Sequence, residues 1–122
     1  MPTENVVLRT TIESVGGVVV VHVAGEVDRV TADDLSGCLA GALGSAHPPA
    51  PVVVDLSEVN FLGACGIGLL LDHQDRCLSR GSALVLVART PEVLRPLQVL
   101  ELTSVLDVRP SLVDALAVPG LA

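Results

Sequence analysis

The segment from Val52 to Leu71, VVVDLSEVNFLGACGIGLLL, most constrains the fold of this chain. A β-branched run over residues 52–56 predicts a buried strand, and a glycine-bounded turn at 63–66 leads into a helical pattern over about 65–79. Such a unit places a loop at the carboxyl end of a strand, which is where open α/β sheets usually carry their function. The turn, Gly63-Ala64-Cys65-Gly66, has no hydroxyl, carboxylate or lysine, so we expect it to act by shape and contact.

The rest of the chain repeats this alternation. Strands are predicted over 6–13, 18–24, 83–88 and 105–108, with a hairpin turn at Gly16-Gly17 and a helical stop at Gly81. Helices are predicted over about 35–43, from Thr90-Pro91 onward with a kink or restart at Pro96, and after Ser111. The order β-β-α-β-α-β-α-β-α predicts one α/β domain over residues 1–122. Its sheet is mixed and mostly parallel, with about five strands and about four helices.

Helix ends and faces follow from the same patterns. Thr31 with Asp34, and Ser111 with Asp114, have the spacing of capping boxes. Leu97, Leu100 and Leu102 are the expected apolar face of the third helix. The helix over 65–79 is expected to bury five side chains, namely Ile67, Leu70, Leu71, Gln74 and Leu78.

Charge and composition exclude several classes of function. The chain of 122 residues has a net charge of −7, which disfavours a nucleic-acid partner. No apolar run approaches the roughly 20 residues that span a bilayer, and residues 1–5 lack the pattern of a signal peptide, so we expect a cytoplasmic protein without a membrane partner. The three cysteines, Cys38, Cys65 and Cys77, form no metal-binding or redox motif, and we expect reduced thiols.

Several motifs together resemble the STAS domain, and in particular the free-standing anti-sigma factor antagonists of bacteria. They are five stretches that span nearly the whole chain: Gly25-Glu26-Val27-Asp28, Val54-Asp55-Leu56-Ser57 with Val59 and Phe61-Leu62, the turn ending in Gly66-Ile67-Gly68, Leu97 to Thr103, and Arg109 to Leu116. The resemblance implies a protein that binds an anti-sigma factor of the Bergerat-type serine kinase class and thereby releases a sigma factor. It also implies an off-switch, in which that kinase phosphorylates a Ser or Thr in the turn.

The chain departs from the family pattern in that turn. Gly63 stands at the Asp position, Ala64 at the phospho-acceptor position and Cys65 at the second hydroxyl position. A methyl group cannot accept a phosphoryl group, so we expect an antagonist that is not controlled by phosphorylation there. Alternatives are a STAS subunit of a scaffold or a transport complex, or a small thiol-redox protein that uses Cys65.

The expected partner-binding residues surround this turn: Asp28, Asn60, Gly63, Ala64, Cys65, Gly66 and Ile67. Asp28 can also bond local amides, and Asn60 can cap the helix. Cys65 is either a redox-sensitive thiol or simply a small residue. A bridge from Cys65 to Cys77 is excluded, because twelve helical residues place their Cα atoms about 18 Å apart.

Other polar residues are expected to have structural roles. We interpret His22 as a core histidine with a satisfied hydrogen bond, and Asp72, His73, Asp75 and Arg76 as a solvated or partner-facing surface. We expect no catalytic residues, metal or cofactor, and a monomer.

Overall fold

The computed structural model describes residues 8–117. Its sheet has five strands in the order β1-β2-β3-β4-β5, with β1 antiparallel to β2 and the other neighbours parallel. The strands are β1 (Arg9–Val15), β2 (Val18–Val27), β3 (Val52–Leu62), β4 (Leu84–Val87) and β5 (Asp107–Arg109). The predicted α/β class, mixed sheet and element order are therefore confirmed.

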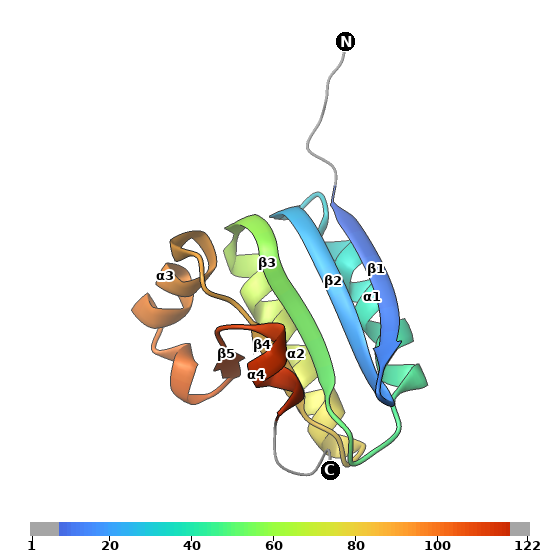
Figure 1. The fold of residues 1–122 in the computed structure, drawn as a ribbon. Helices are drawn as coiled ribbons and strands as arrows, with labels where there is room; N and C mark the ends of the chain where they lie inside the picture. Colours follow the sequence, from blue (N-terminus) through green and yellow to red (C-terminus); the bar gives the residue numbers. More distant parts are fainter. Residues whose placement is uncertain (1–7, 118–122) are drawn as a thin grey trace.

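Helices cover both faces of the sheet, but unequally (Figure 1). The helices are α1 (Ala32–Ser45), α2 (Ala64–Ser79), α3 (Pro91–Val99) and α4 (Leu112–Leu116), with a 3₁₀ turn η1 (Leu102–Ser104). Buried side chains of α1, α2 and α3 share one core with one face of the sheet, whereas the five-residue α4 packs on the opposite face through Ala115.

Side-chain alternation along β2 explains both cores. Val19, Val21 and Val23 face the helices α1 and α2, while Val18 and Val20 belong to the smaller core under α4. The next residue on the α4 side of β2 is His22, which is half-buried. Part of this face of β1, β2 and β3 is therefore left for polar side chains.

Strand lengths differ from the prediction at several points. β3 continues to Leu62, six residues beyond the predicted end, because it keeps pairing with β2 after its pairing with β4 stops at Asp55. β2 likewise runs through Gly25 to Val27. The predicted first strand began at Val6, but residues 6 and 7 lie outside the described residues, and β1 begins at Arg9.

The buried face of α2 is rotated relative to the prediction. Leu78 was expected to be buried but is 57% exposed, whereas His73 was expected on the surface but is 2% exposed. The buried residues are Gly66, Ile67, Leu70, His73 and Cys77. The close approach of Gly66 to Val27 fixes this rotation, and the ring of His73 is held by a 3.0 Å hydrogen bond from Nδ1 to the Leu69 carbonyl. Asp72 and Arg76 do form an exposed ion pair, with 3.1 Å between Nε and Oδ2.

The two predicted capping boxes have different outcomes. Ser111 caps α4 as predicted, because its Oγ accepts from the Asp114 amide at 3.2 Å. Thr31 occupies the N-cap position of α1, but its hydroxyl makes no capping bond there and instead donates to the Glu26 carbonyl at 2.8 Å. The Thr31 hydroxyl is turned back toward β2, so it is unavailable to the first turn of α1.

The third helix and its surroundings also need correction. Pro96 lies inside α3 and does not end it. Leu97 is buried as expected, but Leu100 is 55% exposed because α3 ends at Val99 and Leu100 is its C-cap. All three cysteines are free thiols.

Candidate functional site

The loops that follow β2 and β3 lie side by side at one edge of the sheet. The Gly63 amide donates to the Val27 carbonyl at 2.9 Å, which ties the start of α2 to the end of β2. We use the name loop surface for the surface formed by these two loops together with the end of β3 and the start of α2. It comprises Asp28, Arg29, Val30, Phe61, Gly63, Ala64 and Cys65. A hollow of about 400 Å³ is lined by six of these residues, all except Val30.

The first loop is braced from within. The Asp28 Oδ1 accepts from the Val30 amide at 2.9 Å and from the Thr31 amide at 3.1 Å. The Thr31 Oγ1 in turn accepts from the Asp28 amide at 3.0 Å. Asp28 therefore lies beside the turn, as predicted, and bonds local amides there, while the loop presents Arg29 and Val30 outward.

The atoms that line the hollow of the loop surface are mostly apolar, and apolar side chains beside Arg29 are exposed. Val30 is 87% exposed and Phe61 49% exposed, and Ala64 is also exposed. Apolar side chains gathered at one loop edge are typical of a contact surface for another protein. No side chain of the second loop and the element ends that flank it, residues 61–66, can act as an acid, a base or a hydroxyl nucleophile, and Cys65 is half-buried.

Gly66 and Ile67 support this surface from below. Both are buried in the first turn of α2. A Cβ on Gly66 would lie 2.5 Å from Val27 Cγ1 and 2.9 Å from Leu62 Cδ1, so only glycine lets the helix approach β2 this closely. Of the seven predicted contact residues, these two hold the helix in place beneath the exposed atoms.

Asn60 does not cap α2. It lies within β3 with its side chain exposed, and Gly63 occupies the N-cap position without a side-chain hydrogen bond. The reason is that β3 extends to Leu62, which leaves no turn at position 60.

The sequence prediction missed Arg29, Val30 and Phe61 as surface residues. An isolated valine between Arg29 and Thr31, in a loop between two predicted elements, was one available signal. Phe61, as the single aromatic residue of the chain, was another. Both are large apolar groups that a core-forming role would have buried.

Other classes of site find no support within residues 8–117. In that part of the chain no three His, Cys, Asp or Glu side chains are placed to hold a metal ion. None of the helices described there is both long and apolar enough to cross a bilayer.

Comparison with known proteins identifies the architecture. The family model described as the STAS domain matches residues 9–115. The chain belongs to the STAS-domain family. This STAS domain is 30% identical over 110 residues to the anti-sigma-F factor antagonist RsfA of Mycobacterium tuberculosis, covering 90% of the chain and 86% of that relative.

Solved structures agree with this assignment. The crystal structure of an anti-sigma factor antagonist from Mycobacterium paratuberculosis is 35% identical, with a TM-score of 0.82, and the match covers 89% of this chain and 91% of that one. The anti-sigma factor antagonist SpoIIAA in its unphosphorylated form shares the fold, with a TM-score of 0.70 at 17% identity and coverage of 88% and 93%.

Proposed function

We propose that this STAS domain is an anti-sigma factor antagonist, which binds an anti-sigma factor through the loop surface and so releases a sigma factor. The names of its relatives support the class of partner. The exposed apolar side chains of Val30 and Phe61 support the place of contact. We place the protein in the cytoplasm as a monomer, with a Bergerat-type serine kinase as the anti-sigma factor.

We further propose that binding is not controlled by phosphorylation of the loop surface. The observation that supports this is the absence of an accessible hydroxyl on either loop. The second loop has Ala64 at the exposed tip of α2 and contains no Ser or Thr. The first loop has one hydroxyl, on Thr31, and that residue is 8% exposed with its Oγ1 bonded to the Glu26 carbonyl. Phosphorylation of the loop surface on oxygen therefore has no acceptor.

The loss of a phospho-acceptor hydroxyl at position 64 affects binding because this position lies at the amino end of α2. The amino end of α2 carries unpaired amides and a partial positive charge, so a phosphoryl group there would be tolerated in the free protein. In a complex it would bring about two negative charges into an apolar contact, which would disrupt binding. With Ala64, binding is controlled by the abundance or state of the partner and not by phosphorylation of the antagonist.

The test is a titration against Bergerat-type anti-sigma factors of the same cell, with ADP and with ATP, followed by intact-mass measurement. The wild type should bind with equal affinity in both nucleotides and gain no phosphate. The matched variant Gly63→Asp/Ala64→Ser restores the family pattern. With ATP it should gain the mass of one phosphoryl group and lose affinity for the anti-sigma factor, and with ADP it should do neither.

Two results would contradict the proposal in different ways. Phosphate on the wild-type loops, or loss of wild-type binding with ATP, would refute phosphate-independent binding. No binding to any anti-sigma factor would refute the antagonist function and favour a STAS subunit of a scaffold or a transport complex.

A further inference from the structure

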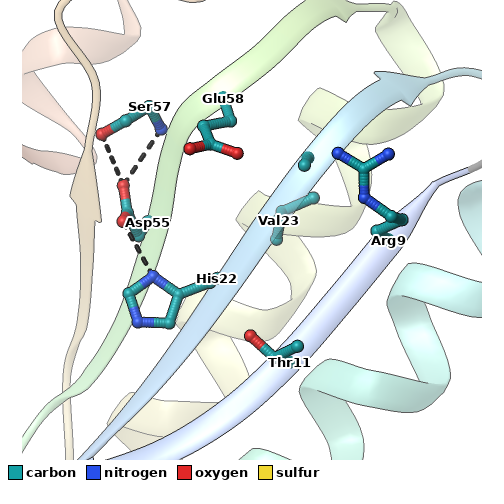
Figure 2. A pocket seen from close by; sticks show the side chains of 8 residues that line it. Arg9, Thr11, His22, Val23, Asp55, Ser57 and Glu58 are labelled. Atoms are coloured by element: carbon teal, nitrogen blue, oxygen red, sulfur yellow. Dashed lines mark hydrogen bonds and ion pairs between the residues drawn. The ribbon is translucent and has the colours of Figure 1, made fainter.

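A histidine bridges three strands on the open face of the sheet, away from the loop surface. His22 on β2 lies between Asp55 on β3 and Glu13 on β1. Its Nδ1 is 2.9 Å from Asp55 Oδ2, and its Nε2 is hydrogen-bonded to Glu13 Oε2. Figure 2 shows the imidazole of His22 directed at Asp55, with Ser57 beyond it. His22 is thus not the core histidine that the sequence predicted, because its side chain is 32% exposed and both nitrogens bond carboxylates.

With both carboxylates ionised, this pair of hydrogen bonds needs a proton on each ring nitrogen of His22. An ionised carboxylate only accepts hydrogen bonds, and a neutral imidazole has a single N–H, so it can satisfy one of the two carboxylates. Asp55 is held as an acceptor, because its Oδ1 also receives the Ser57 amide at 3.0 Å and the Ser57 hydroxyl at 2.5 Å. His22 can therefore donate hydrogen bonds to Glu13 and Asp55 at the same time only as an imidazolium.

The surrounding charges favour the imidazolium. A hollow of about 270 Å³ lies over these strands, and the other charged side chains that line it are Arg9 from β1 and Glu58 from β3. With Glu13 and Asp55, this gives three carboxylates and one guanidinium around His22. The net charge of these groups is negative when His22 is neutral, and a positive charge on the imidazole makes it less negative.

The strand β1 has few other side-chain anchors. It is an edge strand that pairs only with β2, and none of its seven residues is buried. Its backbone ladder to β2 holds it in register, while the Glu13 side chain connects it through His22 to β3. Loss of one of these bonds therefore weakens an element that apolar burial does little to stabilise.

We propose that His22 is a proton-dependent clamp that fastens β1 to the sheet and loosens it when the imidazole loses its proton. Burial alone would lower the pKa of His22, but its hydrogen bonds to Glu13 and Asp55 and the charges of these carboxylates outweigh burial and raise the pKa above its usual value. A raised pKa means that the clamp is complete below the unfolded-state pKa of about 6.5. It is lost as the pH rises through the higher folded-state pKa.

The clamp gives this domain a response to pH that is separate from its partner surface. On deprotonation the ring keeps one N–H, and the other nitrogen turns a lone pair toward a carboxylate. The Asp55 side is the more buried of the two, with a side chain 18% exposed against 52% for Glu13. The bond to Glu13 is therefore the one released, and β1 is the strand that gains freedom.

Amide hydrogen exchange and histidine NMR test this directly. In the wild type, exchange protection of the amides over residues 10–14, corrected for intrinsic rates and compared with β3, should fall about twofold to fivefold between pH 6 and pH 8.5. The ¹⁵N shifts of His22 should show both ring nitrogens protonated at the lower pH. In His22→Gln, β1 protection should be low and independent of pH.

Two further variants keep the result interpretable. Glu13→Gln should also remove most of the pH dependence and lower the pKa of His22, even if His22→Gln folds poorly. Glu58→Gln is the matched control, since Glu58 lines the same hollow without a hydrogen bond to His22. It should keep the full size of the wild-type change in β1 protection, and loss of its negative charge should move the midpoint of that change only toward lower pH. A wild-type β1 whose protection does not change with pH, or changes equally in Glu13→Gln, would overturn the proposal.

Discussion

Gly66 and Gly68 lie in the first two turns of the same helix, but the structure predicts that alanine stabilises the protein at position 68 and not at position 66. A Cβ at position 66 would meet Val27 Cγ1 at 2.5 Å and Leu62 Cδ1 at 2.9 Å. Both neighbours are buried, at 0% and 4% exposure, and the β-branched Val27 has little rotamer freedom with which to move away. At position 68 nothing lies within 4 Å of the added Cβ.

The magnitudes follow from two terms. Alanine in place of glycine inside a helix stabilises it by about 1 kcal/mol, and this term applies to both positions. Overpacking of a core costs typically about 1–3 kcal/mol, and this term applies only to Gly66→Ala. The difference in the free energy of unfolding between Gly66→Ala and Gly68→Ala therefore isolates the steric term, and we expect about 1–3 kcal/mol with Gly68→Ala the more stable.

Urea unfolding of the wild type and both variants measures this difference. Val27→Ala in the Gly66→Ala background adds a check, because removal of the clashing methyl groups should make the effects of the two substitutions non-additive. Equal stabilities of Gly66→Ala and Gly68→Ala would refute the reasoning, since they would mean that α2 does not rest on Val27 in the way described.

Three further outcomes are expected. Ala64→Glu should leave the free energy of unfolding within about 0.5 kcal/mol of the wild type, because the side chain at this position is exposed. It should weaken binding to the anti-sigma factor at least about tenfold in a titration, since it places a charge in an apolar contact. Unchanged affinity would place the contact elsewhere. Ser111→Ala should lower stability by about 1 kcal/mol in urea unfolding through loss of the α4 cap, and Ser111→Thr, which keeps the hydroxyl, should lose less. Burial alone would raise the pKa of Asp55, but hydrogen bonds from Ser57 and His22 lower it, so its stabilising contribution is present above the unfolded-state pKa of about 3.9 and lost as the pH falls through the lower folded-state pKa. Thermal unfolding against pH should show a loss of stability at acid pH that is reduced in Asp55→Asn; an identical acid limb in that variant would contradict this assignment.

The element order was predictable because its signals are local. β-branched runs marked strands, and Gly16, Gly17 and Gly81 marked the ends of elements at positions where the backbone adopts a positive φ. The neighbourhood of Asp28 and the 63–66 turn was predictable for a related reason, since both follow parallel strands that are adjacent in the sheet.

Features set by contacts between distant segments were not predictable in this way. The rotation of α2, which buries His73 and exposes Leu78, depends on the contact between Gly66 and Val27. His22 looked like part of an apolar strand because its two partners come from other strands. The sheet register places Asp55 directly opposite His22, while Glu13 is paired with Val20 and reaches His22 diagonally through its side chain. A single sequence contains the residues but not these alignments.

The unequal length of the strands has a consequence for how the loop surface can change during evolution. β3 pairs with β4 only over residues 52–55, but pairs with β2 up to Leu62, so the two loops stand on a two-stranded extension beyond the wider sheet. Substitutions at positions such as Val30 or Phe61 therefore leave the valine layers of the central strands intact. Gene duplication followed by drift at the rim can produce antagonists with different partners on one unchanged scaffold, and related copies in a single genome can diverge in specificity without first losing their fold.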